Sequence, residues 1–154
     1  TALFRALSED RSLVDSYDFI FVDCPPSLSL LTINAMVAAN SVLIPLQSEF
    51  FALEGLSQLM LSVREIRNSV NTELRFEGVV LTMFDRRNNL SQQVEKDARE
   101  NLGEIVFKTV IPRNVRLSEA PSHSMPVLTY EPRSRGAQAY RRLAKEFLKN
   151  NRDI

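Results

Sequence analysis

Short apolar runs alternate with longer segments of helical periodicity along this chain, and this alternation limits the folds that it can adopt. A continuous apolar run is typical of a strand that is buried on both faces of a sheet. Segments in which apolar residues recur every three or four positions are typical of helices instead. Strands that alternate with helices predict an α/β fold, in which a mostly parallel sheet carries helices on both faces. The predicted strands are 17–23, 41–46, 76–84 and 105–111, the predicted helices are 1–14, 29–39, 53–70, 91–102 and 135–150, and the Pro-rich segment 112–132 is a predicted loop.

The composition predicts one soluble domain without a strong charge of either sign. The chain has 154 residues, of which 44% are hydrophobic, and this is enough for one domain with a core. Nineteen basic residues balance nineteen acidic ones, so any surface for nucleic acid must come from local clustering. Cys24 is the only cysteine, which excludes an internal disulfide and fits a reducing cytoplasm. No run approaches the roughly 20 apolar residues of a membrane span.

Asp23 follows an almost wholly apolar run and is followed by a cysteine and two prolines. Open α/β sheets bind their ligands at the carboxyl ends of the strands, which is where Asp23 would lie. In P-loop nucleotide hydrolases, an Asp after four apolar residues is the Walker B residue, which helps to hold Mg²⁺ near the phosphates. The alternative is an Asp that only opens a turn, because Asp and Pro are common turn residues.

Three further predicted strands also end in polar or proline-bearing segments. These segments begin at Gln47, at Thr82 and at Pro112. Each is ordinary loop chemistry when taken alone. Because the carboxyl ends of parallel strands meet at one edge of a sheet, the four loops together predict a ligand site at that edge.

Four groups of motifs follow one another along nearly the whole chain. The first is Phe-Val-Asp-Cys-Pro-Pro-Ser at 21–27 with Leu-Thr-Ile-Asn-Ala at 31–35. Next come Ile-Pro-Leu-Gln-Ser-Glu at 44–49 with Ala-Leu-Glu-Gly at 52–55, Gly-Val-Val-Leu-Thr-Met-Phe-Asp at 78–85 and Val-Ile-Pro-Arg-Asn-Val-Arg-Leu-Ser-Glu-Ala-Pro-Ser-His at 110–123. In this order and spacing they resemble the carboxyl-terminal part of the ParA/Soj partition ATPases, within the ParA/MinD group of deviant Walker proteins.

The resemblance implies a P-loop NTPase-like fold in which 1–154 is the carboxyl-terminal part of a single ParA-type ATPase domain. It implies a protein that dimerises with ATP, binds DNA without sequence preference and hydrolyses ATP when a ParB-type partner stimulates it. Such cycling moves or positions chromosomes and plasmids. The implied cofactors are ATP and Mg²⁺, and the implied location is the cytoplasm, in association with the nucleoid.

The same resemblance implies roles for individual residues. Asp23 would be the catalytic Walker B residue and would reach Mg²⁺ through water. Gln47 and Glu49 would lie near the nucleotide and the dimer seam. The positions that would flank the adenine base are Thr82, Met83, Pro112 and Arg113.

The family's Gly-rich, two-lysine Walker A loop has no counterpart in these residues. The four glycines lie at 55, 78, 103 and 136, and none of them clusters. A phosphate cradle needs consecutive backbone N–H groups and a helix amino terminus. We therefore expect the amino-terminal Walker A portion to be absent from this stretch, and these residues by themselves to be inactive as an ATPase.

Arginines are concentrated in the second half of the chain, and by resemblance Arg87 and Arg116 match the arginines that hold nonspecific DNA. The guanidinium fork suits phosphate, and such binding depends on salt. The alternative is that these arginines are solvated surface charges, some of them paired with Asp85, Glu119 or Glu131.

Two other functions stay open. A MinD-like division-site ATPase would need a membrane-targeting tail, whereas the last predicted helix is expected to pack its apolar stripe on the sheet. A noncatalytic module would bind DNA or a full-length partner through its arginines without turning over ATP. His123, the single histidine, is expected to be structural, because no serine and carboxylate arrangement accompanies it.

Overall fold

The computed structural model describes residues 1–25, 27–49 and 51–151. Within these residues the chain forms two compact units. Unit 1 comprises Thr1–Val42 and Gly55–Glu77, and unit 2 comprises Leu43–Glu54 and Gly78–Ile154. Each unit is described by itself below.

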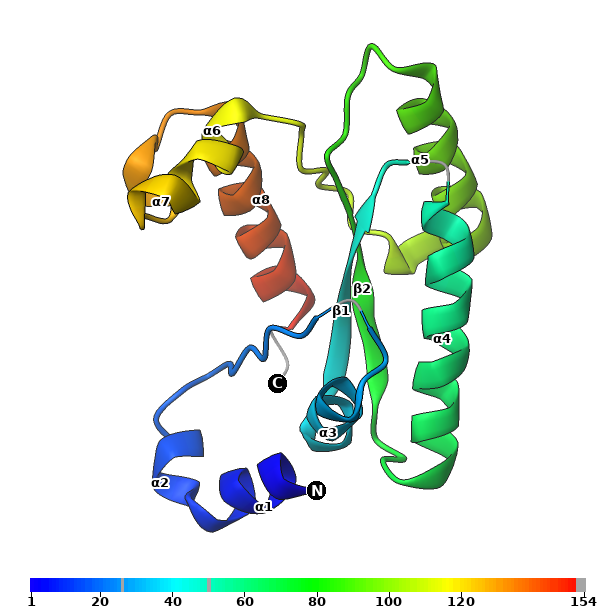
Figure 1. Cartoon of the computed structure of the whole chain (residues 1–154), viewed down its shortest axis with the longest axis vertical. Coiled ribbons are helices and arrows are strands. Elements are labelled where there is room, and N and C mark those ends of the chain that lie inside the picture. Colours follow the sequence, from blue (N-terminus) through cyan, green and yellow to red (C-terminus); the bar gives the residue numbers. More distant parts are fainter. Residues whose placement is uncertain (26, 50, 152–154) are drawn as a thin grey trace. The chain divides into compact units, whose positions relative to one another are not determined.

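Two strands, β1 (Ser41–Gln47) and β2 (Arg75–Thr82), form a two-stranded sheet and lie side by side in Figure 1. The amide of Arg75 donates to the carbonyl of Asn40 at 3.1 Å, and the amide of Ser48 donates to the carbonyl of Thr82 at 3.1 Å. From the first of these hydrogen bonds to the second, the residue numbers rise in both strands, so the two strands are parallel. The predicted strands 41–46 and 76–84 and the predicted α/β class are confirmed.

The other edge of β2 pairs with the segment that follows residue 105. The amide of Phe107 donates to the carbonyl of Val79 at 2.9 Å, and the amide of Ile111 donates to the carbonyl of Leu81 at 2.8 Å. Parallel bridges join Val79 to 106 and 84 to 112. No continuous strand forms between these bridges, so the predicted strand 105–111 is wrong. The reason is that the amides of residues 108 and 109, between the bridges, donate to a side chain of the last helix instead of to a strand.

The predicted strand 17–23 is irregular backbone in the structure. Most of its apolar side chains are exposed, with Phe21 at 68%, whereas Phe19 is half-buried, and the rings of Phe19 and Phe21 lie with centroids 6.5 Å apart. A strand needs a neighbouring strand to satisfy its backbone, and the sheet of the described residues contains β1 and β2 alone. An apolar run indicates a preference for burial, but it does not indicate whether a pairing partner is present.

The helices of unit 1 enclose a small core. The predicted helix up to residue 14 is divided into α1 (Ala2–Glu9) and α2 (Arg11–Val14), whereas the predicted helices 29–39 and 53–70 correspond to α3 (Leu30–Ala38) and α4 (Ala52–Ser69). The side-chain amide of Asn71 donates to the carbonyls of Met36 and Ala39 at 2.9 and 2.8 Å, which satisfies the end of α3. The buried residues of this core are Met36, Val63, Ile66 and Leu74.

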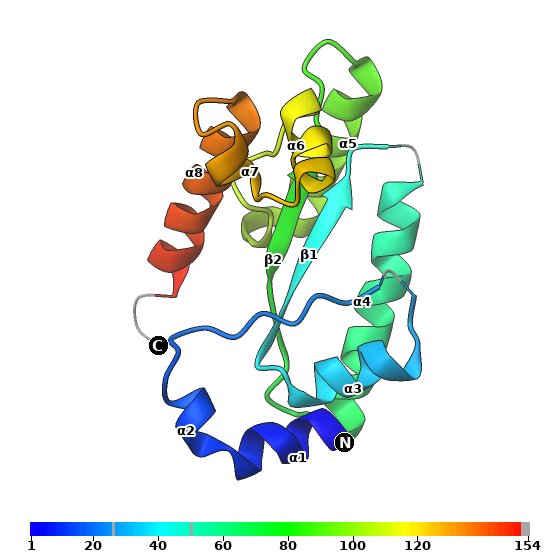
Figure 2. The same ribbon diagram turned by 60° about the vertical axis from the view of Figure 1, so that its left-hand side comes forward.

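In unit 2, helices cover both faces of the sheet, as predicted. Figures 1 and 2 show α5 (Asn89–Leu102) and α8 (Arg135–Asn150) on opposite sides of β2. These helices confirm the predicted helices 91–102 and 135–150. The core on the α8 side consists of Val80, Phe107, Ile111 and Ala139, with Leu43, Leu117, Leu143 and Phe147 packed against it.

The predicted loop 112–132 contains short helices, so that prediction is wrong. Figure 2 shows α6 (Val115–Glu119) and α7 (Val127–Tyr130), and a 3-10 turn, η2 (Ala120–His123), lies between them. The side chain of Asn114 accepts the amide of Arg116 at 3.1 Å and caps α6. Pro121 stands in the first turn of η2, where a missing N–H costs nothing. The remaining 3-10 turn, η1, is Gly103–Ile105.

The helices in the described ranges include none whose length and apolar character would allow it to span a bilayer.

Replacing Gly78 by alanine is expected to destabilise the protein by about 1–3 kcal/mol, the usual cost of overpacking a core. A Cβ at this position would overlap the ring of Phe107 and would lie 2.9 Å from the carbonyl oxygen of Ile105, and the φ of Gly78 is +155°. Gly55 in α4 has nothing within 4 Å of such a Cβ, so Gly55→Ala is the matched control and should stabilise by up to about 1 kcal/mol. Urea denaturation measures both changes. A Gly78→Ala variant with an unchanged midpoint would contradict the close approach.

Glu146 of α8 holds the segment beside β2, and its contribution should depend on pH. Its carboxylate accepts the amides of Lys108 and Thr109 at 2.6 and 2.9 Å. Burial opposes ionisation, but the hydrogen bonds from Thr109 and Lys108 outweigh it and hold the pKa of Glu146 below its ordinary value of 4.5. A lowered folded pKa gives stability that is present above the ordinary pKa and is lost as the pH falls through the folded one.

Glu146→Gln is therefore expected to destabilise the protein by about 1 kcal/mol at neutral pH. The difference from the wild type should shrink as the pH falls below 4.5. Urea denaturation across that pH range measures it, with Glu104→Gln at an exposed carboxylate as the control. A difference that persists unchanged in acid would show that the stabilisation by Glu146 does not depend on its ionised carboxylate.

Candidate functional site

Three of the four loops predicted to form a site come together in unit 2. They leave the carboxyl ends of β1, of β2 and of the segment beside β2 (Figure 1). The amide of Phe84 donates to the carbonyl of Ile111, and the amide of Arg113 donates to the carbonyl of Phe84, at 3.1 and 3.0 Å. We use the name carboxyl edge for the predicted site residues at the ends of these three segments, which are Gln47, Glu49, Thr82, Met83, Pro112 and Arg113.

Hydroxyl groups of two buried serines and of a half-buried threonine hold the backbone of the carboxyl edge. The hydroxyl of Ser48 donates to the carbonyl of Thr82 at 3.1 Å, and the hydroxyl of Thr82 donates to the carbonyl of Leu46 at 3.3 Å. From α5, the hydroxyl of Ser91 donates to the carbonyl of Ser48 at 3.3 Å, and both of these serines are buried. The loop that carries Gln47 and Glu49 is therefore tied to β2 and to α5. Ser48 belongs to the polar segment that was predicted to follow the strand, whereas Ser91 was not predicted, since a single serine in a helix carries no functional signal.

Met83 has an unusual backbone conformation at this edge. Its φ is +53°, which lies in the left-handed region that side chains other than glycine rarely adopt. Such a conformation costs about 1–3 kcal/mol and tends to occur at functional sites. It therefore supports the carboxyl edge as a candidate site.

The charged groups of the carboxyl edge are exposed and loosely paired. A guanidinium nitrogen of Arg113 lies 3.6 Å from a carboxylate oxygen of Glu49, and both side chains are about 60% exposed (61% and 59%). Pairs that are this exposed contribute little, typically about 0–1 kcal/mol. Either side chain can therefore leave this ion pair and contact a ligand with little loss of free energy.

Asp23, the fourth predicted position of the site, belongs to unit 1. It is exposed, in the irregular segment that follows Val22. The thiol of Cys24 contacts the carbonyl of Val22 at 3.7 Å. The predicted metal role of Asp23 stays a prediction, and the second proline of the motif, Pro26, lies outside the described residues. Within the described part of the chain, no group of three or more His, Cys, Asp or Glu residues could hold a metal ion.

The two arginines predicted to hold DNA are exposed, and each is paired with a carboxylate. Arg87 contacts Asp85 through Nε at 3.4 Å and Nη2 at 3.5 Å. Arg116 contacts Glu119 through Nη1 at 2.7 Å. The pairing that was the alternative to DNA binding is therefore present, although exposed pairs of this kind exchange readily.

These pairs change the pKa values of their members. Hydrogen bonds from the backbone and side chain of Arg87 hold the pKa of Asp85 below its ordinary value, and the charge of Arg113 adds to this effect. The hydrogen bond to Glu119 raises the pKa of Arg116. Asp85 and Arg116 therefore carry their charges at neutral pH.

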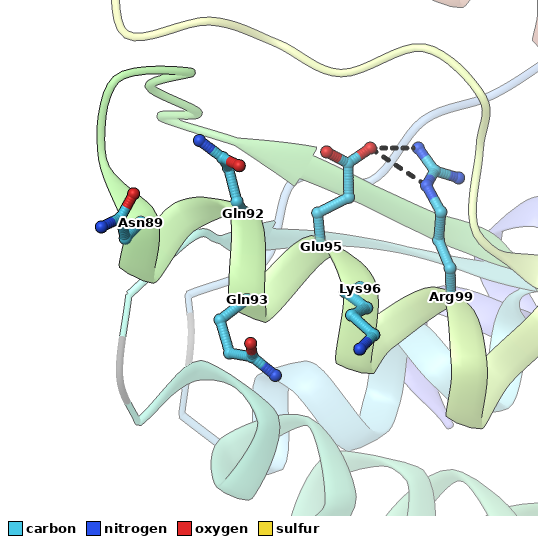
Figure 3. A pocket seen from close by; sticks show the side chains of 6 residues that line it. All are labelled: Asn89, Gln92, Gln93, Glu95, Lys96 and Arg99. Carbon is cyan, nitrogen blue, oxygen red and sulfur yellow. Dashed lines mark hydrogen bonds and ion pairs between the residues drawn. The ribbon is translucent and has the colours of Figure 1, made fainter.

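Two shallow hollows lie along α5, and neither contains a residue of the carboxyl edge. Figure 3 shows the larger, of about 580 Å³, where Arg99 and Glu95 form a double contact at 3.0 and 2.9 Å. Its lining comes from one helix and holds neither a hydroxyl or thiol nucleophile nor a pair of carboxyl groups, so it is a weak candidate for chemistry. The larger hollow is lined by Asn89, Gln92, Gln93, Glu95, Lys96 and Arg99, and the smaller, of about 390 Å³, by Phe84, Arg86, Gln92, Glu95, Lys108 and Val110.

Solved structures define the class of this fold. Cobyrinic acid a,c-diamide synthase from Mycobacterium smegmatis, with ADP and magnesium bound, is 31% identical and superposes with a TM-score of 0.76 over 99% of this chain and 54% of that one. The cell division ATPase MinD from Pyrococcus furiosus is 27% identical, with a TM-score of 0.76 over 96% of this chain and 57% of that one. The fold is therefore P-loop NTPase-like.

Curated sequences narrow the class. The AAA domain family matches residues 2–76. The chromosome partitioning protein ParA of Caulobacter vibrioides is 56% identical over 137 residues, which are 89% of this chain and 51% of that protein. The sporulation initiation inhibitor protein Soj of Bacillus subtilis is 58% identical over 148 residues, which are 96% of this chain and 57% of that protein. The chain spans about half the length of these relatives, and over that stretch the predicted resemblance to the ParA/Soj partition proteins is confirmed.

Ser91→Ala is expected to loosen the carboxyl edge, because it removes the hydrogen bond from α5 to the buried carbonyl of Ser48. The loss should destabilise the protein by about 1 kcal/mol. It should also speed hydrogen exchange at the amides of Ser48 and Glu49. Ser118→Ala, at an exposed serine of α6, is the matched control. Unchanged exchange at 48 and 49 would show that α5 does not hold this loop.

Proposed function

We propose that the intact protein is a ParA/Soj-like ATPase for chromosome or plasmid partitioning, and that residues 1–154 are the carboxyl-terminal part of its single ATPase domain. One observation carries the proposal. The residues of the carboxyl edge lie together in a chain that is 56% identical, over 137 residues, to a protein named chromosome partitioning protein ParA. A relative from Thermus thermophilus is itself named a chromosome-partitioning ATPase.

The nucleotide base would lie at the carboxyl edge. Met83 and Pro112 offer apolar contacts for the flat face of an adenine, and the guanidinium of Arg113 can stack on it. The hydroxyl of Thr82 donates to the carbonyl of Leu46, which leaves its oxygen to accept a hydrogen bond from a base amino group. Gln47 and Glu49 would lie near the nucleotide and the seam between two subunits.

Magnesium would be held by Asp23 through water and otherwise by the phosphates. Mg²⁺ keeps several waters and takes one or two carboxylates together with substrate phosphates. A single exposed carboxylate such as Asp23 fits that donor set, and a cage of side chains is not required. When bound with ATP, the ion would neutralise charge that develops on the phosphates.

The phosphates themselves would need a Gly-rich turn that these residues do not contain. The glycines at 55, 78, 103 and 136 are isolated from one another, so no nest of consecutive N–H groups can form from them. We therefore propose that residues 1–154 do not hydrolyse ATP by themselves.

DNA would be held by Arg87 and Arg116 through its phosphates, without reading the bases. ATP would bring two copies together, and a ParB-type partner would stimulate hydrolysis and release. This cycle would place the protein on the nucleoid in the cytoplasm. The exposure of both guanidinium groups supports the proposal.

Asp23→Asn and Arg113→Ala in the intact protein separate the proposed roles. Asp23→Asn should lower kcat for ATP hydrolysis by about 10- to 100-fold, as loss of an outer-shell metal partner typically does. Arg113→Ala should raise KM for ATP by about two- to fivefold through the loss of a stacking cation. Arg64→Ala, at an exposed arginine of α4, is the control. Steady-state hydrolysis with Mg²⁺ measures both constants, and wild-type values in both variants would refute the assigned nucleotide site.

The MinD-like alternative has one observation in its favour, the match to a MinD structure at a TM-score of 0.76. It predicts sedimentation of the intact protein with anionic lipid vesicles and not with DNA. The noncatalytic alternative predicts DNA binding without any hydrolysis of ATP. Vesicle and DNA sedimentation, together with the hydrolysis assay, distinguish these two functions from the proposed one.

A further inference from the structure

Arg87 and Arg116 are held by carboxylates of the same chain through different edges of the guanidinium group. Asp85 faces the Nε–Nη2 edge of Arg87, with oxygens 3.4 Å from Nε and 3.5 Å from Nη2. Glu119 takes Nη1 of Arg116 at 2.7 Å. The hydroxyl of Tyr130 also interacts with the guanidinium of Arg116, and Glu119 is the one carboxylate that contacts this guanidinium within the described ranges, through Nη1 and not through the Nε–Nη2 edge.

This difference matters because paired N–H groups on one edge form the fork that binds a phosphate with two hydrogen bonds. In Arg87 the Nε–Nη2 fork already faces a carboxylate. A phosphate could use that fork only after Asp85 had yielded it. In Arg116 the same fork can receive a phosphate while Glu119 still holds the other side.

Asp85 is well placed to compete, because it is charged and fixed. Its Oδ1 accepts the amide of Arg87 at 3.0 Å, which sets the side chain in a tight local turn. The contacts with Arg87 and the charge of Arg113 lower its pKa, so it is a full anion at neutral pH. The side chain of Arg87 is 91% exposed, so a phosphate can approach it directly.

Glu119 is placed to hold its arginine in position. One of its oxygens accepts Nη1 of Arg116 at 2.7 Å and also faces the hydroxyl of Tyr130 at 3.4 Å. The ring of Tyr130 stacks on His123, with centroids 4.7 Å apart. The carboxylate is thus supported by a neighbouring side chain, and it fixes Nη1 of Arg116.

We propose that Asp85 competes with nucleic-acid phosphate for the Nε–Nη2 fork of Arg87, whereas Glu119 positions Arg116 without occupying its fork. The inference rests on the proposed function in one respect, that Arg87 and Arg116 contact DNA. It adds a regulatory group: Asp85 weakens nonspecific DNA binding by occupying its own arginine.

The test uses Asp85→Asn in the intact protein. An asparagine keeps the oxygen that accepts the amide of Arg87, so the turn is preserved and only the charge is removed. Because an exposed pair is weak, the affinity for nonspecific duplex DNA should rise by about two- to fivefold. Glu119→Gln is the matched control, since it removes one charge from the other carboxylate of unit 2 that pairs with a proposed DNA-binding arginine, and it should raise the affinity less. Fluorescence anisotropy with a duplex of arbitrary sequence, at several salt concentrations, measures both variants.

A double-mutant cycle with Arg87→Ala separates competition from general repulsion. The gain from Asp85→Asn should disappear in the Arg87→Ala background, because no fork remains to be released. An equal gain in that background, an equal gain from Glu119→Gln, or no gain at all would overturn the inference.

Arg87→Ala alone tests the proposed function on which the inference rests. If Arg87 contacts a phosphate, this variant should weaken binding and reduce the slope of log affinity against log salt by about 0.9. Unchanged affinity and slope would refute the DNA surface itself. A weakened Arg87→Ala variant together with an ineffective Asp85→Asn variant would refute the competition alone.

Discussion

The hydrogen bonding of β2 on both of its edges is the constraint on which the rest of unit 2 depends. One edge pairs with β1, and the other pairs with the segment that contains Phe107 and Ile111. Both neighbours run parallel to β2, so all three segments end at the same side. The carboxyl edge exists because of this common direction, since the residues that follow each segment meet there.

The packing of β2 makes that pairing close and rigid. Val79 and Leu81 are almost completely buried, and Val80 packs with Ala139 of α8. Gly78 lets the backbone of β2 approach the ring of Phe107, where a larger residue would not fit. Between the two bridges, Glu146 accepts the amides of Lys108 and Thr109, which would otherwise be available to a strand. The charged side chains of the candidate site are therefore exposed, while the backbone that carries the site is held from both faces of the sheet.

The sequence predicted most of the elements of unit 2 and the residues of the carboxyl edge. The strands at 41–46 and 76–84 and the helices at 91–102 and 135–150 were correct because their periodicity is strong and their ends carry local signals. Asn88 and Ser134, for example, cap α5 and α8 with their own side chains. The loop 112–132 was wrong because prolines mark the first turns of short helices as well as loops. The strands 17–23 and 105–111 were wrong because strand formation depends on a partner elsewhere in the chain.

The amino-acid sequence by itself determined where the longer helices α3, α4, α5 and α8 lie, which positions are apolar, and the motifs that resemble the partition ATPases. These properties are local, because they follow from backbone preferences and from the spacing of side chains over a few residues. Tertiary structure alone decided that the carboxylate of Glu146 accepts the amide of Lys108, 38 residues earlier in the chain, in place of a strand partner. It also decided that Glu49 contacts Arg113. It also decided which edge of each arginine faces a carboxylate. Such contacts join groups that are distant in sequence or that depend on side-chain orientation, so no local pattern encodes them.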